Sequence, residues 1–133
     1  MNATIELIAR LHDTDRRLVS IFSRTDPDRR RELIGIRRAM IGQLWELKRH
    51  ASGPDCHIDP ALKQELAKRV SALWGEVALI QATWPAATID QYASEHRAAT
   101  RKTKATLDDL FVWADRNIRP RPSRSPQDLR KVS

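Results

Sequence analysis

The sequence contains a single cysteine and no long hydrophobic run, and both shortages limit the class of protein it can be. Its single cysteine, Cys56, cannot form a disulfide within the chain, which is typical of a protein kept in a reducing compartment. No apolar run reaches the roughly 18 residues that a membrane-spanning helix requires. The first residues do not combine a basic start with an apolar stretch, so we expect no signal peptide. The sequence therefore predicts a cytoplasmic protein that does not enter a membrane.

The sequence does contain enough apolar material for one folded domain. It has 133 residues, of which 41% are hydrophobic, and this length suits one domain better than two. The formal net charge of +7 is distributed unevenly. The positive excess lies in residues 1–53 and 119–133, whereas residues 54–118 are close to neutral.

Hydrophobic residues recur three and four positions apart along most of the chain, with little of the alternation that a strand would show. This spacing predicts four helices, at roughly 3–23, 27–51, 60–83 and 88–118. Cap and breaker residues mark the helix boundaries: Thr25 with Asp28, Gly53, Asp59 with Pro60, Pro85, and Thr88 with Gln91. Because short links favour antiparallel neighbours, the predicted fold class is all-α, an antiparallel four-helix bundle.

Residues 119–133 differ in composition from the helical part. They are rich in proline and arginine and nearly free of apolar side chains. This composition is typical of an extended segment without a packed core. We therefore predict one helical domain at 1–118, followed by a disordered basic tail at 119–133.

The helix boundaries also predict which residues face one another. In an antiparallel pair of helices, the residue numbers at facing positions have a constant sum. A turn centred near residue 26 places Asp15 opposite Arg37. A turn centred near residue 86 places Leu66 opposite Thr106.

Asp15 is the most specific polar feature of the sequence, because it interrupts an otherwise apolar helix face. A buried carboxylate without a partner costs several kcal/mol. Asp15 therefore needs a counter-charge, and Arg37 is the residue expected opposite it. We interpret the two residues as a structural polar pair that sets the helix register. The alternative is a polar pocket inside the bundle, with Asp15 as an acid or a base.

His96 lies in the middle of the stripe on the fourth predicted helix, beside Ala99, Thr100 and Thr103. The side chains of the stripe are small and partly polar there, whereas core side chains are usually large. We favour a hydrogen-bonded core histidine, and a small binding cavity is the alternative. If Asp15, Arg37 and His96 converged on one cavity open to solvent, they would form a candidate site.

The sequence contains no recognisable catalytic, cofactor-binding or metal-binding motif. Its histidines are scattered, and the Glu-x-x-His pairs of a di-iron bundle are missing. Cys56 adjoins His57, but adjacent side chains rarely face each other, and no third group accompanies them. We therefore expect no cofactor and no enzymatic activity.

The first functional hypothesis comes from tryptophan. The chain has four tryptophans but one tyrosine and two phenylalanines, which is an unusual proportion. Trp113 lies off the apolar stripe of its helix, and Trp45 lies at the edge of its own. Since exposed tryptophan is enriched at interfaces, we expect a small non-enzymatic interaction or adaptor protein. It would bind another protein, or itself, through a helix face near Trp45 and Trp113.

The second hypothesis is an accessory nucleic-acid-binding protein. Arginines on the first two predicted helices and in the tail could follow a phosphate backbone: Arg16, Arg17, Arg24, Arg31, Arg38, Arg49, Arg119, Arg121 and Arg124. If they instead pair with nearby carboxylates, they form an ordinary solvated face. Helices of this length do not resemble a helix-turn-helix, so binding would be salt-sensitive and weakly sequence-selective.

Overall fold

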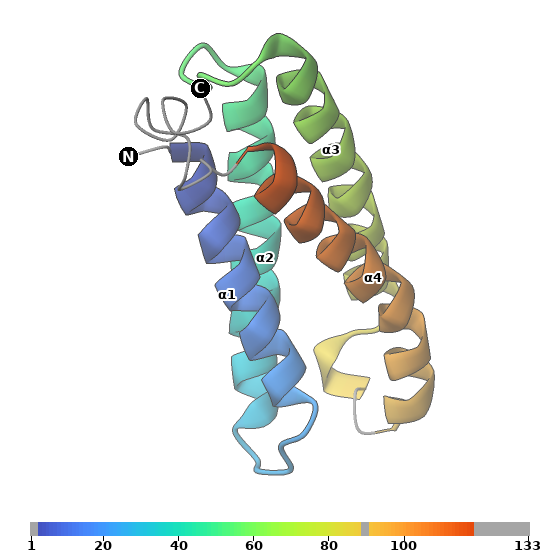
Figure 1. Ribbon diagram of the computed structural model, residues 1–133. Helices are drawn as coiled ribbons and strands as arrows, with labels where there is room; N and C mark the ends of the chain where they lie inside the picture. The colour runs from blue at the N-terminus through green and yellow to red at the C-terminus, as the bar shows by residue number, and fades with distance from the viewer. Residues whose placement is uncertain (1–2, 89–90, 119–133) are drawn as a thin grey trace, which may run out of the picture.

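The computed structural model describes residues 3–88 and 91–118, which form four α-helices and no strand (Figure 1). The helices are α1 (Ala3–Ile21), α2 (Arg29–Ser52), α3 (Pro60–Thr83) and α4 (Ala93–Asn117), and a short 3-10 turn, η1 (Ala86–Thr88), precedes α4. The predicted all-α class with four helices is confirmed. The predicted tail at 119–133 lies outside the described residues.

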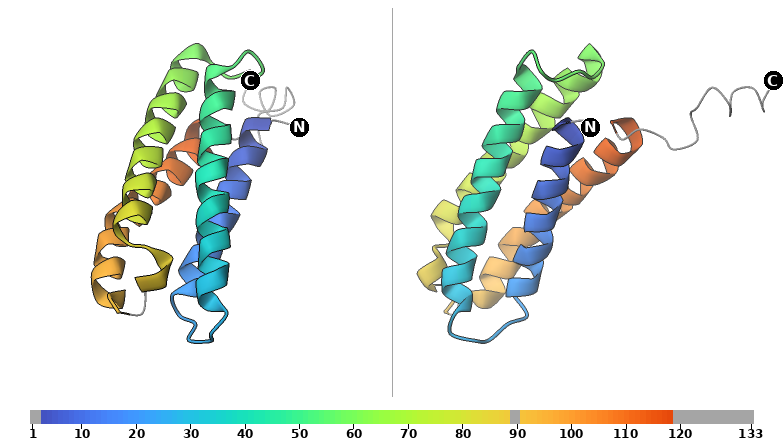
Figure 2. Two further views of the ribbon diagram at one scale, coloured as in Figure 1. Left: turned by 180° about the vertical axis from the view of Figure 1, so that it is seen from behind. Right: turned by 90° about the vertical axis from the view of Figure 1, so that its left-hand side faces the viewer.

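The chain reverses direction at each link, so α1 and α3 run one way and α2 and α4 run the other way (Figure 1). α2 packs along both α1 and α3, whereas α4 packs mainly on α3 and touches α1 only slightly. Two turned views show that α4 is inclined to the other helices and crosses them (Figure 2). The seam between α1 and α4 is therefore loosely packed.

The sequence signals at the link between α2 and α3 are confirmed. The Asp59 carboxylate accepts a hydrogen bond from the Ala61 backbone N–H at 2.9 Å, and proline occupies the first turn of α3. Gly53 is the C-cap of α2, and its N–H donates to the His50 carbonyl at 3.0 Å. Both caps satisfy backbone groups that a helix end leaves without a partner.

The predicted starts of α2 and α4 are wrong in detail. Asp28 precedes α2, but its side chain makes no capping hydrogen bond. α4 begins at Ala93 rather than at 88. The Thr88 hydroxyl donates to the Pro85 carbonyl at 2.9 Å, so it closes the η1 turn and caps no helix. The 3-10 turn after Pro85 occupies residues that the periodicity assigned to α4.

The later start of α4 changes its register against α3. Thr106 of α4 contacts Glu76 rather than Leu66, and Arg69 lies over the ring of Trp113. The prediction assumed a tight turn near residue 86, whereas the link contains η1 and continues to residue 92. α4 is consequently displaced along α3 from its expected position.

Buried apolar side chains form two clusters. The larger cluster draws on all four helices, with Leu11, Leu44, Leu73 and Leu107 among its members. The smaller cluster lies beside the link between α1 and α2 and consists of Ile21, Leu33 and Ile36. Leu18 packs against both clusters and also lines a cavity. Leu18 therefore connects the two clusters beside the cavity.

Candidate functional site

A cavity of about 320 Å³, partly open to solvent, lies among the four helices. Asp15, Arg37 and His96 all line it, so the three polar residues that the sequence singled out converge on one space. The rest of the lining is largely apolar and includes Leu18, Phe22, Met40, Val77, Ile80 and Leu107. This combination of apolar walls and a few polar groups is typical of small-molecule sites.

Asp15 of α1 is 1% exposed, and its ion partner comes from α4. Asp15 Oδ2 accepts a hydrogen bond from Lys104 Nζ at 2.7 Å, and Lys104 Nζ also donates to Asp108 Oδ1 at 2.6 Å. Burial alone lowers the pKa of Lys104, but the hydrogen bonds to Asp108 and Asp15 outweigh it and raise that pKa. Lys104 therefore stays charged and compensates the buried carboxylate.

Asp15 and Arg37 do not pair with each other, contrary to the prediction. Lys104 is the partner of Asp15, and Arg37 bonds to His96 instead. Thr14, which adjoins Asp15, donates to Gln43 Oε1 at 2.8 Å. Residues of α2 beyond Arg37 therefore face this part of α1, and the simple turn-centred register misplaced the pair.

His96 of α4 is 2% exposed, and its protonation state follows from its neighbour. Arg37 Nη2 lies 3.0 Å from His96 Nε2. Because a guanidinium can only donate, Nε2 must accept, and the neutral ring carries its proton on Nδ1. Burial, together with the charge of Arg37, lowers the pKa of His96 to about 4. The ring is therefore neutral at physiological pH.

Two buried polar atoms of the cavity residues have no hydrogen-bond partner among the described residues: Asp15 Oδ1 and His96 Nδ1. Oδ1 is an acceptor, and Nδ1 is a donor in the tautomer that Arg37 imposes. Leaving such a group unpaired costs about 1–3 kcal/mol. Two residues that line the cavity therefore each keep one unused polar atom, an acceptor on Asp15 and a donor on His96.

Arg37 is half-buried and has no carboxylate partner among the described residues. Burial lowers its pKa, but a guanidinium remains charged at neutral pH. The Arg37 carbonyl accepts a hydrogen bond from Gln81 Nε2 at 3.1 Å, which links α2 to α3 behind the side chain. Arg37 thus brings an uncompensated positive charge to the cavity wall.

Sequence reasoning missed the contribution of α4 to this site. Arg97, Arg101 and Lys104 line the cavity beside His96. The only available signal was the small polar stripe around His96, which pointed to a gap but named no cation. Which of the exposed α4 cations turns toward the cavity depends on the register of α4, and the sequence predicted that register incorrectly.

A larger cleft of about 850 Å³ opens farther along the seam between α1 and α4. Ile5, Ile8 and Phe111 line it, and the ring of His12 meets that of Phe111 edge-on at 4.7 Å. None of its lining residues has a buried polar atom without a partner among the described residues. The smaller cavity therefore carries the more specific chemistry.

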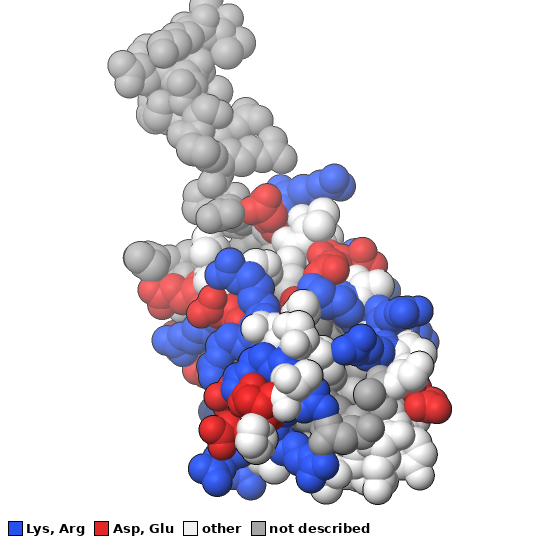
Figure 3. Space-filling view, turned by 90° about the horizontal axis from the view of Figure 1, so that it is seen from below, with Lys and Arg blue, Asp and Glu red and all other residues white. Residues whose placement is uncertain are grey.

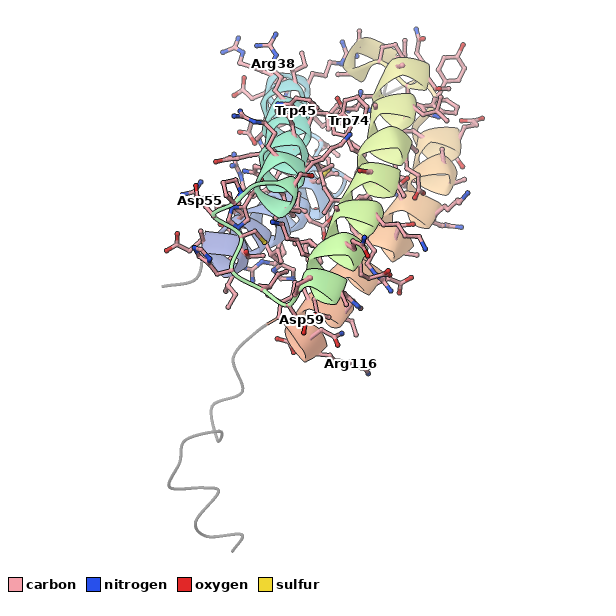
Figure 4. The ribbon with its side chains drawn as sticks, turned by 90° about the horizontal axis from the view of Figure 1, so that it is seen from above. Arg38, Trp45, Asp55, Asp59, Trp74 and Arg116 are labelled. Carbon is pink, nitrogen blue, oxygen red and sulfur yellow. The ribbon has the colours of Figure 1, made fainter. Side chains whose placement is uncertain are left out.

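The two tryptophans predicted to form an interface lie in different grooves. Trp45 is 49% exposed and its ring lies 6.5 Å from that of Trp74 across the groove between α2 and α3 (Figure 4). Lys48 lies over both rings at 5.8 Å. Trp113 is partly buried under Arg69, in the groove between α3 and α4. Only Trp45 presents a large exposed surface.

The arginines of the nucleic-acid hypothesis differ in their surroundings. Arg16 bonds to Asp13 at 2.9 Å, and Arg24 pairs with both Asp26 and Glu32. Four more lie exposed on α1 and α2, namely Arg17, Arg31, Arg38 and Arg49. Arg119, Arg121 and Arg124 lie outside the described residues. At the end of the molecule that holds the α1–α2 link, basic and acidic side chains are interleaved (Figure 3).

A second buried polar cluster joins the start of α1 to the end of α2. The Thr4 hydroxyl lies 2.7 Å from His50 Nε2 and 3.7 Å from Cys56 Sγ. Both Thr4 and Cys56 are buried, so the cluster ties three segments together. Within the described part of the chain, no three potential metal ligands come together.

No described helix combines the length and the apolar composition needed to cross a bilayer. No protein-family model matches the chain, and no curated protein or solved structure is significantly similar to it. The geometry of the cavity is therefore the main evidence for function.

Proposed function

We propose that this chain is a ligand-binding helical bundle that takes up a small molecule in the cavity lined by Asp15, Arg37 and His96. One observation carries the proposal: Asp15 and His96 both line one cavity, and each has a buried polar atom, Oδ1 and Nδ1, without a partner among the described residues. Native proteins rarely leave such atoms unsatisfied. We expect a bound ligand to turn these side chains toward it and to supply the missing partners.

The size and the lining of the cavity favour a ligand over water alone. Its volume of about 320 Å³ far exceeds the roughly 30 Å³ share of one water molecule. Apolar side chains supply much of the wall, and water gains little from such a surface. A small molecule with an apolar body and a few polar atoms would satisfy both parts of the lining.

A cavity-filling substitution tests this proposal. Thr100 lines the cavity, and Ala105 is exposed on the same helix. We expect Thr100→Leu to weaken ligand binding by about tenfold or more, a loss of about 1.4 kcal/mol, because the larger side chain occupies space that the ligand needs. Ala105→Leu is the matched control and should bind like the wild type. Calorimetric titration with small aromatic compounds of positive, negative and zero charge provides the measurement.

A result in which no compound of any charge binds the folded wild-type protein would contradict the proposal. Equal binding by Thr100→Leu and by Ala105→Leu would also contradict it, because the ligand would then occupy another site. Circular dichroism of both variants establishes that they are folded.

A second candidate function is protein interaction through the Trp45 surface. It is favoured by the exposure of Trp45 beside Trp74, since tryptophan is enriched at interfaces and at their hot spots. Light scattering of the wild type and of Trp45→Ser tests it.

A further inference from the structure

We infer that the ligand of the cavity is an organic oxyanion, a carboxylate or a phosphate monoester, attached to a compact apolar body, and that Arg37 binds its charged end. This inference rests on the proposed function and adds the chemical class of the ligand. It follows from the distribution of charge in the cavity wall.

Arg37 is the central observation. Its guanidinium has five N–H donors, and one hydrogen bond, to His96, is present among the described residues. A partly buried charge without a counter-ion is unfavourable, because burial removes the water that would otherwise solvate it. The planar fork of arginine matches the geometry of carboxylate and phosphate oxygens. An oxyanion in the cavity would supply both the charge and the acceptors.

The rest of the wall excludes a cation as the ligand. The lining contains four cationic side chains, Arg37, Arg97, Arg101 and Lys104, and one carboxylate, that of Asp15. Lys104 already compensates Asp15 at 2.7 Å. His96 is neutral and adds no charge. The cavity wall thus has a positive excess that repels cations and attracts anions.

Arg101 makes the rim of the cavity attractive to the same anion. It is exposed, it lines the cavity, and it has no ion pair or hydrogen bond among the described residues. Arg97 Nη2 donates to the Phe22 carbonyl at 2.8 Å, as Arg37 Nη2 does to His96, so both guanidinium groups keep further donors. Arg101 is the cation of the lining that has no partner at all among the described residues.

The remaining features describe the rest of the ligand. The apolar side chains Leu18, Phe22, Val77 and Leu107 suit a compact hydrocarbon or aromatic body. If the two side chains turn toward the cavity, His96 Nδ1–H would donate to a second oxygen of the ligand, and Asp15 Oδ1 would accept from a hydroxyl group. A small amphipathic acid that carries a hydroxyl group would then pair both atoms.

Calorimetric titration with one matched series of probes tests the inference: 3-phenylpropanoate, 3-phenylpropanamide, 3-phenylpropylammonium and 2-phenylethyl phosphate. The four compounds share an aromatic body and differ in charge. We expect one of the two anions, or both, to bind at least about tenfold more tightly than the amide. One charge-assisted hydrogen bond contributes enough free energy for that difference. We expect the ammonium compound to bind least.

Arginine variants locate the anion. Arg37→Gln and Arg101→Gln should each weaken anion binding and leave amide binding nearly unchanged, with the larger loss, about tenfold or more, for Arg37→Gln. Arg38→Gln is the matched control, because Arg38 adjoins Arg37 on α2, is exposed and does not line the cavity. The Arg101 variant keeps the test informative if Arg37→Gln does not fold.

The outcomes separate the inference from the proposed function. If the amide or the ammonium compound binds as tightly as the anions, and Thr100→Leu abolishes that binding, the cavity binds ligands but the oxyanion inference is wrong. Equal losses in Arg37→Gln, Arg101→Gln and Arg38→Gln would mean general charge attraction and would also overturn it. If no probe binds at all, both the inference and the proposed function fail.

Discussion

At the scale of single residues, the cavity depends on three polar side chains whose partners come from other helices. Asp15 is compensated by Lys104 of α4, and Arg37 of α2 fixes the tautomer of His96. Each pair joins two helices, so neither can form before those helices pack. These residues act together, and a change in one alters the electrostatics of the others.

His96 gives a pH prediction at this scale. Burial and the adjacent Arg37 lower its pKa to about 4, below the usual value of 6.5. Between these two values the unfolded chain binds the proton more readily than the folded chain does. The free energy of unfolding should therefore fall as the pH drops from about 6.5 to about 4, by up to roughly 3 kcal/mol.

Urea unfolding of the wild type, His96→Gln and His57→Gln between pH 4 and pH 7 measures this effect. The slope of stability against pH should flatten in His96→Gln. It should persist in His57→Gln, because His57 is exposed in a loop. Comparing slopes removes any constant loss of stability caused by the substitution itself. Identical slopes in all three proteins would show that another group is responsible.

At the scale of helices, the boundaries follow local chemistry where a side chain has a single local partner. Asp59 caps α3 through the Ala61 N–H, and the dipeptide Asp59–Pro60 announces that cap in the sequence. Thr88 offered the same type of signal before α4, but its hydroxyl bonds to the Pro85 carbonyl. The difference arises because proline favours a turn between Trp84 and Thr88.

Removing the Asp59 cap should destabilise the fold. We expect Asp59→Ala to lower the free energy of unfolding by about 1 kcal/mol, since the Ala61 N–H loses its acceptor at the end of a helix. Asp55→Ala is the matched control: Asp55 is exposed in the same link and caps no helix (Figure 4). Denaturant melts of both variants give the comparison, and equal losses would mean that the carboxylate acts through general charge.

At the scale of the whole molecule, the inclination of α4 opens the seam with α1 (Figure 2). Both the candidate site and the larger cleft line that seam, with residues from α1 and α4 in each. Apolar side chains are thus buried along more of α2 than of α1 or α4. A loose seam between α1 and α4 would let a ligand enter without separation of the helices packed on α2.

Self-association of the chain involves the surface of the whole molecule. If the Trp45 surface binds a second copy of the chain, light scattering should detect a dimer that persists at high salt, because apolar contacts are not screened. Trp45→Ser should weaken that dimer. Leu79→Ser, which removes another exposed apolar side chain, should not. A monomer at every salt concentration would count against self-association through Trp45.

The same experiment tests the nucleic-acid hypothesis, which stays a prediction. Bound nucleic acid would raise the absorbance at 260 nm, and high salt would remove it. Deleting 119–133 should weaken such binding, since that segment holds Arg119, Arg121 and Arg124. Binding that is indifferent to both salt and the deletion would contradict this hypothesis.

Local patterns in the sequence are enough to predict the class of the fold and part of the site. Apolar spacing predicts four helices, because a helix must turn one face toward a core whatever its neighbours are. Asp15, Arg37 and His96 stand out for the same local reason, since each places a polar group on an apolar stripe. Features that depend on one helix alone can be found in this way.

Which of these residues meet depends on how the helices pack. Lys104 replaces Arg37 as the partner of Asp15, and Arg37 turns to His96, because the register between helices depends on packing along their whole length and on the true start of α4. A shift of a few residues changes every facing pair while leaving the periodicity of each helix intact. The cavity and its charge therefore emerge from the assembled bundle.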